Sequence, residues 1–192
     1  NSFLHIKNAD VYVTGSNAKF LSSDIITEFR GRGDQIYLSP LSFKEYFDYC
    51  KMGFDDAWNE YSMYGGMPYL LSCKTAEQKI NYLENLFTET YMKDIVNRNN
   101  IRNTEVLEDV LNIVSSSVGS LTNPNKLSNS FKSIKNIDVA PNTIKQYLDY
   151  CIDSFLLHKA YRYDVKGKKY LDTPLKYYFT DIGLRNARLG FR

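Results

Sequence analysis

The sequence predicts an α+β fold that is mostly α. Its clearest element is an amphipathic helix from Thr75 to about Arg98, in which apolar residues recur with the helical period of 3.6 residues. Only four short runs, near residues 12, 36, 160 and 178, have the β-branched or aromatic composition that is typical of strands. Helices should therefore form most of the structure.

The first forty residues are expected to hold two strands with a short helix between them. The strands are Asp10–Thr14 and Gln35–Leu38, and Ser22–Asp24 offers side chains that can cap the helix. The glycines on either side of Arg32 should end that helix. This order, strand, polar turn, helix and strand, is typical of an α/β sheet.

Helices should follow without further strands as far as residue 157. Ser42 predicts the start of a helix Phe43–Cys50, and a second helix, 54–64, should end at Gly65-Gly66. The residue before a proline avoids helical backbone, so Met67-Pro68 is expected to form an extended bend.

The second half of the chain has the order of elements that is typical of a winged helix. Three helices separated by turns are followed by two strands that a basic loop connects, and Asp181 should cap a last helix, Ile182–Leu189. The expected helices and strands are Thr104–Val118, Lys126–Ile134, Thr143–Leu157, Lys159–Val165 and Tyr177–Thr180.

The start of the helix from Thr143 carries side chains that suit DNA recognition, because these positions face the major groove in a helix-turn-helix. Asn and Gln can hydrogen-bond to adenine, and Lys can contact guanine or phosphate. A lysine-rich loop between the two strands would act as a wing against backbone phosphates. The candidate DNA-binding residues are Asn142, Thr143, Lys145, Gln146, Lys166, Lys168 and Lys169.

Charge is distributed unevenly along the chain. Residues 1–123 carry 11 Lys and Arg against 16 Asp and Glu, a net charge of −5, whereas residues 124–192 carry 13 against 6, a net charge of +7. A basic carboxyl-terminal third is compatible with duplex DNA as a partner. The alternatives are a protein-interaction or self-association module, or lysines that are only solvated or prevent edge strands from pairing.

Cysteine and histidine usage argues against a metal site. Cys50, Cys73 and Cys151 are odd in number and lie far apart with no CxxC pair, which argues against a disulfide framework and favours a cytoplasmic location. His5 and His158 leave almost no metal ligands, and no apolar run is long enough to span a bilayer. With no signal peptide and no initial Met, we expect a cytoplasmic excerpt of a longer protein that has no membrane partner.

The stretch VYVTGSNAKFLSS, residues 11–23, suggests phosphate chemistry because a buried strand ends there in a polar tip. Asn17 or Ser16 could orient the water that attacks a γ-phosphate, and Arg32 could project as an arginine finger. A plain turn and a surface charge are the alternative interpretation of these residues.

Several long motifs resemble a widespread family of prokaryotic AAA+ ATPases. VYVTGSNAKFLSS…GRGDQIYLSPLSFKEYFDY resembles the end of the family's ATPase core. YGGMPYLL, YMKDIVNRNNIR and YLDYCIDSFLLHKAYRYDVKGKKYL…KYYFTDIGLRNARLG resemble the uncharacterised domain that follows it. The resemblance implies a remnant of the AAA+ sheet in residues 1–50, a helical linker in 51–100 and a winged-helix-like domain in 101–192.

The resemblance also implies roles for individual residues. Asn17 corresponds to the family's sensor residue, the polar side chain at the tip of the strand, and Ser16 is the second candidate for it. Arg32 corresponds to the Arg of the family's GR motif. The signature Tyr64–Pro68 is interpreted as structural, a glycine hinge before a packed helix.

Two features of the family are missing from this chain, the phosphate loop GxxxxGK[ST] and the strand ending in Asp-Glu. We therefore expect ATP and Mg²⁺ to be bound in the parent protein, and this fragment alone to bind no cofactor and to be non-catalytic. Residues 1–40 should be poorly ordered, repacked or paired with another chain, because the strand between their two strands is missing.

The expected function is that of a carboxyl-terminal piece of an AAA+ ATPase with a DNA-binding winged helix. The alternative is a non-catalytic interaction or dimerisation module.

Overall fold

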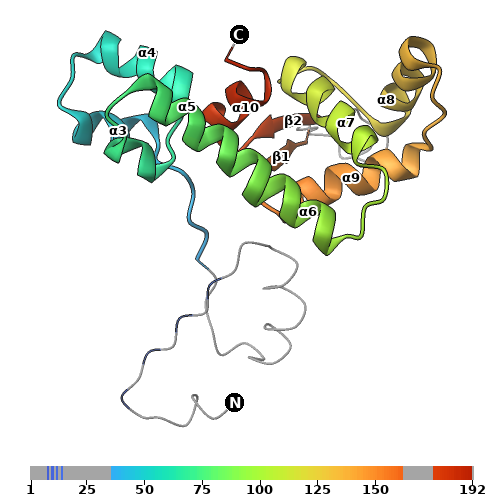
Figure 1. Cartoon of the computed structure of the whole chain (residues 1–192), viewed down its shortest axis with the longest axis horizontal. Coiled ribbons are helices and arrows are strands. Elements are labelled where there is room, and N and C mark those ends of the chain that lie inside the picture. Colours follow the sequence, from blue (N-terminus) through green and yellow to red (C-terminus); the bar gives the residue numbers. More distant parts are fainter. Residues whose placement is uncertain are drawn as a thin grey trace, which may run out of the picture.

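The described residues of this computed structural model, 36–161 and 175–191 together with 8, 10, 12 and 14, form the mostly helical α+β fold that the sequence predicts (Figure 1). The elements are α3 (Phe43–Cys50), α4 (Phe54–Tyr64), η3 (Pro68–Ser72), α5 (Ala76–Asn85), η4 (Leu86–Met92), α6 (Lys93–Arg98), α7 (Thr104–Ser116), α8 (Pro124–Ser130), η5 (Phe131–Lys135), α9 (Pro141–Asp153), β1 (Leu157–Ala160), β2 (Lys176–Phe179) and α10 (Ile182–Arg188).

Helices α3 and α4 form a hairpin with the predicted bounds. The Ser42 hydroxyl accepts from the Glu45 N–H at 3.3 Å, and the Glu45 carboxylate accepts from the Ser42 N–H at 2.8 Å, which completes a capping box. Helix α4 ends where Gly65 adopts a φ of 79°, a conformation that glycine tolerates. The Phe43 ring packs edge-on against Trp58 of α4, with ring centroids 4.9 Å apart.

The predicted helix Thr75–Arg98 is confirmed as one continuous rod, α5–η4–α6, shown in green in Figure 1. Thr75 caps its start through a capping box with Gln78. The middle of the rod, Leu86–Met92, is a π-helix, which the sequence period does not indicate. Such widened turns occur frequently at functional sites.

The carboxyl-terminal half has three helices followed by an antiparallel hairpin. In the register of β1 and β2, Leu157 lies opposite Phe179 and Ala160 lies opposite Lys176. An isolated bridge joins Thr122 to Leu175 just before β2. Asp181 caps α10 by accepting from the Leu184 N–H at 3.2 Å, as predicted.

Helix α9 ends at Asp153, so the prediction of helix as far as Leu157 and of a strand from Lys159 was wrong by a few residues. The cause is Phe155, which has a left-handed φ of 59°. The Leu156 N–H donates to the Cys151 carbonyl and the Phe155 N–H to Ile152, the pattern of a Schellman motif. Glycine usually occupies that left-handed position, so a phenylalanine there gives no recognisable stop signal.

The predicted strand Gln35–Leu38 is wrong for residues 36–38, which form no strand. Ile36 is 75% exposed and Leu38 is 93% exposed, and no strand within the described ranges lies beside them to provide hydrogen-bonding partners. Of the predicted strand Asp10–Thr14 only residues 10, 12 and 14 are described, and the predicted helix after Ser22–Asp24 lies outside the described residues.

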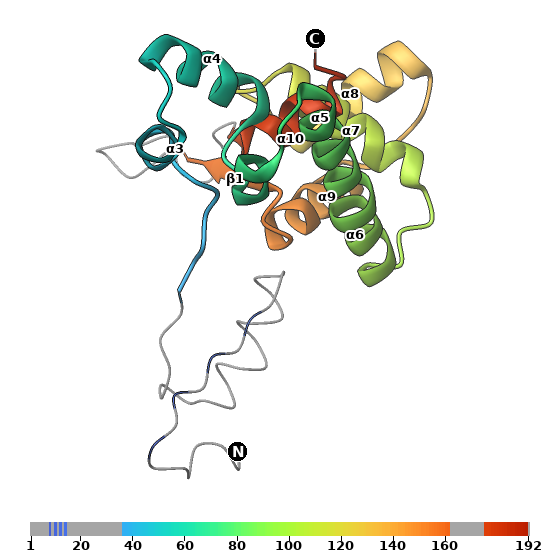
Figure 2. The ribbon, with the colours of Figure 1, turned by 60° about the vertical axis from the view of Figure 1, so that its left-hand side comes forward.

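One hydrophobic core joins the helices from η3 to α10. Leu83, Leu107, Leu148 and Leu184 are fully or almost fully buried in it, and burying each such side chain contributes about 1.5–3 kcal/mol. Helix α10 packs against α4, α5, α7 and β2, and Figure 2 shows it directly behind α5. Residues 54–98, 104–161 and 175–191 are therefore packed together around α10. The division into a linker, 51–100, and a domain, 101–192, stays a prediction.

Candidate functional site

Several residues that the sequence singles out lie outside the described part of the chain. These are the candidate sensor and finger residues Asn17, Ser16 and Arg32, and the wing residues Lys166, Lys168 and Lys169. Their roles stay predictions.

The other candidate DNA-binding residues lie together at the start of α9, which begins at Pro141. Asn142, Lys145 and Gln146 are exposed and Thr143 is half-buried, whereas Ile144 on the opposite side is fully buried. Helix α8 packs against α9. The structure therefore places these four residues on one accessible stretch of helix.

Acidic side chains flank this stretch. Asp138 precedes α9 and is exposed, and the half-buried Asp149 is four residues after Lys145. A polyanion approaching α9 would meet both carboxylates, which weakens phosphate binding at this position. The positive charge of Lys145 is therefore opposed by two acidic side chains that are close to it in the sequence.

A second group of residues surrounds the Tyr64–Pro68 signature. The Asp181 carboxylate is buried and accepts from the Gly66 N–H at 2.7 Å as well as from the Leu184 N–H. Burial raises the pKa of this carboxyl, and the hydrogen bonds from the Gly66, Leu184 and Gly183 N–H groups oppose the rise. The signature is thus bonded to the start of α10, 115 positions later in the chain.

The end of α4 is also capped by α10. The Asn186 side chain donates to the Ser62 carbonyl at 2.9 Å and to the Met63 carbonyl at 2.8 Å. Arg185 donates from Nε to the Ser115 carbonyl of α7 at 2.9 Å. The two Asn186 bonds hold the carboxyl end of α4 against α10, because carbonyl groups at a helix end need external donors, and the Arg185 bond joins α10 to α7.

The segment before α3 is attached to the same place. The Leu41 N–H donates to the Gly66 carbonyl, and the Tyr61 hydroxyl donates to the Leu41 carbonyl, both at 2.8 Å. Glu60 of α4 accepts from Tyr46 of α3 at 2.7 Å and forms an ion pair with Lys79 of α5. Leu41, Gly66, Gly183, Asp181 and Asn186 lie where the segment before α3, the end of α4 and the start of α10 meet, through hydrogen bonds and close backbone packing. We call these five residues the junction.

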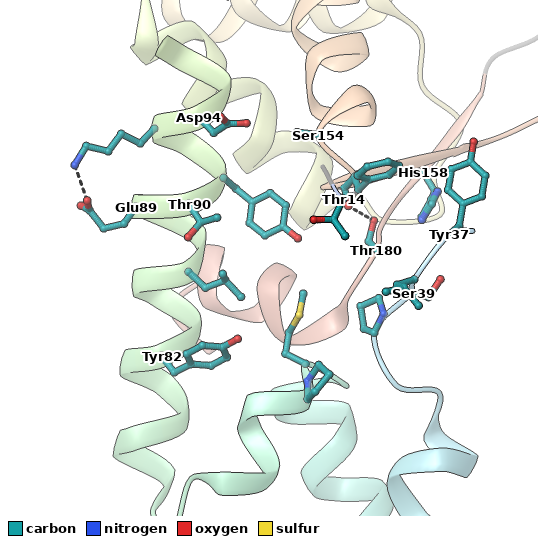
Figure 3. Close-up of a pocket in the computed structure, with 18 of the residues that line it drawn as sticks. Thr14, Tyr37, Ser39, Tyr82, Glu89, Thr90, Asp94, Ser154, His158 and Thr180 are labelled. Atoms are coloured by element: carbon teal, nitrogen blue, oxygen red, sulfur yellow. Dashed lines mark hydrogen bonds and ion pairs between the residues drawn. The ribbon is translucent and has the colours of Figure 1, made fainter. Parts of the chain in front are cut away.

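A cavity of about 860 Å³ lies beside the junction (Figure 3). One side is formed by Ser39 and Pro40, and the floor by Met67 and Pro68. The opposite side is the rod 76–98, which contributes residues from Tyr82 to Asn97, and the end is closed by residues around His158 on β1. The sequence does not indicate this cavity, because Tyr82 and Tyr91 lie at positions of the helical period that are typical of core residues.

Several polar side chains on the cavity wall form no hydrogen bond within residues 36–161 and 175–191, among them those of Tyr82, Thr90, Tyr91 and His158. Burial raises the pKa of Tyr82 and of Tyr91, so both hydroxyls keep their protons at neutral pH. The wall therefore offers hydroxyl and imidazole groups that are able to bond to a ligand.

The charged groups of the rim are paired. Lys93 and Glu89 lie 2.6 Å apart, and Arg98 and Asp94 lie 2.7 Å apart. In the described part of the chain no three His, Cys, Asp or Glu side chains approach closely enough to hold a metal ion, and Cys50, Cys73 and Cys151 are free thiols. None of the helices described has both the length and the apolar composition that a membrane span requires.

Two family models match the chain. The model described as Domain of unknown function (DUF8612) matches residues 55–192, and the model described as AAA domain matches residues 1–47. An uncharacterized protein of Haemophilus influenzae is 37% identical over 190 residues, covering 95% of this chain and 46% of the relative. Uncharacterized protein MJ1544 of Methanocaldococcus jannaschii is 26% identical over 194 residues, covering 95% and 43%. The chain thus spans less than half the length of these relatives.

Proposed function

Because the chain belongs to the family described as Domain of unknown function (DUF8612) and its first 47 residues match an AAA domain, we propose that it is part of an ATP-hydrolysing protein. In this proposal residues 1–47 contribute to the nucleotide site. The helical domain follows the movements of the AAA part and transmits them to a partner.

The bonded connection between the two matched regions carries this proposal. The AAA match ends at residue 47, inside α3, and α3 is held to the following domain by the Leu41–Gly66 bond and by the packing of Phe43 on Trp58. A connection with these contacts is more constrained than a linker of small polar residues. A rotation of the AAA part would therefore move the helical domain as a body.

The residue roles follow from the chemistry of phosphoryl transfer, which needs positioning and charge stabilisation. Asn17, or else Ser16, orients the attacking water in this proposal, and Arg32 stabilises the charge that develops on the γ-phosphate. ATP and Mg²⁺ are held by the rest of the AAA domain.

We expect the intact Haemophilus influenzae relative to hydrolyse ATP in the presence of Mg²⁺. Alanine at its position aligned with Arg32 or Asn17 should lower kcat at least about 100-fold, because each change removes stabilisation made in the transition state. Steady-state phosphate release measures this. Alanine at the position aligned with the exposed Lys44 of α3 is the control and should leave kcat unchanged.

The present chain, which contains no GxxxxGK[ST] loop, should bind ATP too weakly for calorimetry in the micromolar range. Micromolar binding by these 192 residues, or an intact relative without ATPase activity, would contradict the proposal.

Duplex DNA is the second candidate partner, and the exposed residues Asn142, Lys145 and Gln146 on α9 favour it. Helices α7, α8 and α9 followed by β1 and β2 are the elements that a winged helix requires. We infer a reading helix α9 and a wing formed by the loop that carries Lys166, Lys168 and Lys169.

This candidate predicts salt-dependent binding. Fluorescence titration of a labelled duplex should show affinity falling steeply between 50 and 200 mM salt. Replacing Lys166, Lys168 and Lys169 by alanine should make the plot of log K against log[salt] less steep. Its slope should change by about 0.9 for each phosphate that the variant no longer neutralises. Alanine at the exposed Lys44, Lys51 and Lys74 is the matched control, with an equal reduction of charge at the other end of the chain. If no DNA is bound at 50 mM salt, the interaction-module alternative remains, and light scattering would detect a dimer.

A further inference from the structure

The hairpin of α3 and α4, residues 43–64, carries a cluster of aromatic rings that is partly open to solvent. Two of the rings are largely exposed, Phe54 by 59% and Trp58 by 49%. Monomeric proteins rarely expose adjoining apolar side chains on this scale unless the surface binds a partner. We call this hairpin the aromatic end. The rings in mutual contact are those of Phe43, Phe47, Phe54, Trp58 and Tyr61.

The aromatic end is also acidic. Residues 43–64 carry five Asp and Glu against two Lys, a net charge of −3. Asp55 and Asp56, in the first turn of α4, are exposed and form no ion pair with the rest of the described chain. A partner for this surface should therefore combine apolar side chains with positive charge.

Residues 124–145, from α8 to the start of α9, have that combination. They carry four Lys against one Asp, a net charge of +3. Ile134 is 80% exposed. Lys132, two positions earlier, is exposed and has no ion-pair partner among the residues that the structure describes. We call residues 124–145 the basic end.

The turn that carries Ile134 is already ordered in the single chain. Asn136 adopts a left-handed φ of 55°, and the Ile137 N–H donates to the Phe131 carbonyl at 3.4 Å. The Phe131 side chain is buried in the core and anchors the turn from below. Docking such a turn costs little conformational entropy, because its backbone is fixed beforehand.

The two ends lie on opposite sides of the molecule. Figure 1 shows α3 and α4 at one end of the long axis and α8 at the other, and Figure 2 also shows them on opposite sides. One folded chain therefore cannot bring its own two ends together, whereas two chains can meet head to tail. Because such a contact joins two different surfaces, each pair of chains keeps one free end of each kind and can add further copies.

We propose that the basic end of one copy of this chain docks on the aromatic end of a second copy. Ile134 packs against Phe54 and Trp58, and Lys132 lies beside the carboxylates in the first turn of α4. The inference goes beyond the proposed ATPase function and does not depend on it, because the chain is tested without nucleotide.

The first test uses Trp58, which is the only tryptophan of the chain and so reports directly on the aromatic end. In about 50 mM salt the average mass from light scattering should rise with protein concentration, and the Trp58 emission should shift to shorter wavelength as the ring loses contact with water. In about 500 mM salt both changes should require at least about tenfold more protein, because salt screens exposed charges. A chain that stays monomeric up to about 1 mM, or that associates without any shift in emission, would overturn the inference.

Two double variants each disable one end. Asp55→Lys with Asp56→Lys reverses the charge of the aromatic end, and Lys132→Ala with Ile134→Ala removes a charge and an apolar side chain from the basic end. All four side chains are exposed, so the fold should be kept, which circular dichroism checks. Each double variant should associate at least about tenfold more weakly than the wild type.

A third double variant is the matched control for charge. Glu84→Lys with Glu105→Lys changes the net charge as much as the aromatic-end variant does, at exposed positions that belong to neither end. It should associate as the wild type does. Equal weakening in this control would show that net charge alone governs association, and would contradict the proposed contact.

Mixing the two end variants distinguishes a head-to-tail contact from a symmetric dimer. Each variant keeps one intact end, so an equimolar mixture should form a single contact and stop at a dimer, at concentrations where each variant alone is monomeric. A mixture that stays monomeric would overturn the inference. So would a basic-end variant that dimerises by itself as tightly as the wild type, because that result requires a contact between two aromatic ends.

Discussion

Replacing Gly183 by alanine should lower the free energy of unfolding by about 4 kcal/mol or more, a loss that few single substitutions cause. A Cβ atom at this position would overlap the Tyr64 carbonyl oxygen and lie 2.5 Å from the carbonyl carbon. Neither group can move away easily, because Gly183 is buried in α10 and Tyr64 ends α4, whose carbonyls are held by Asn186. The close approach of two backbones, rather than a special φ, requires glycine here.

Gly66→Ala should have a similar effect, since its Cβ would overlap the Leu41 carbonyl oxygen and lie 3.0 Å from the Leu41 carbonyl carbon. Urea unfolding followed by circular dichroism measures both variants. Gly53→Ala is the matched control, because the nearest atom to its Cβ, on Asp56, is 3.7 Å away and its φ of −61° suits alanine. If Gly183→Ala were no less stable than Gly53→Ala, the close packing at the junction would be refuted.

The junction also decides how the signature Tyr64–Pro68 should be understood. From the sequence, this signature is expected to be a glycine hinge before a packed helix. In the structure, Gly65 reverses the chain with a φ of 79°, and Gly66 is bonded on both sides, to Leu41 and to Asp181. A residue held in this way fixes the angle between the elements that it joins. The rigid connection on which the proposed coupling depends thus has its centre at Gly66.

Local signals made most helix bounds predictable from the sequence. Ser42 and Asp181 each act as the helix cap that their side chain and position indicated. Such signals involve residues three or four positions apart, so that the sequence alone displays them. Phe155 shows the limit, since a left-handed residue that is not glycine or asparagine gives no recognisable sign of a helix end.

The candidate site was much less accessible from the sequence. The bond from Gly66 to Asp181 joins residues 115 positions apart, and no local pattern announces it. The cavity is formed by several separate segments, and its tyrosines have the same helical spacing as core residues. Motifs such as GSN and GR stand out because they are short and polar, whereas a binding surface made of packed side chains becomes visible only in three dimensions.

Asp181→Ala should lower the free energy of unfolding by about 3 kcal/mol, the second large effect that we expect. The carboxylate is buried and accepts from the Gly66 and Leu184 N–H groups, and alanine leaves both donors without a partner away from water. Thr75→Ala is the control: it removes a helix cap at an exposed site and should cost only about 1 kcal/mol. A loss in Asp181→Ala no greater than in Thr75→Ala would show that Asp181 acts as a cap alone.

The pH dependence of stability provides an independent test of Asp181. Burial raises the pKa of this carboxyl, so the folded protein keeps the proton at pH values where the unfolded chain, with a pKa of about 3.9, has released it. The contribution of Asp181 to stability is therefore complete below that ordinary pKa and is lost as the pH rises through the raised pKa of the folded state. Asp181→Asn does not titrate, so the free energy of unfolding of the wild type, minus that of this variant, should decrease as the pH rises above the ordinary carboxyl pKa of about 3.9. An increase over the same range would mean that the backbone donors outweigh burial and that the pKa is lowered.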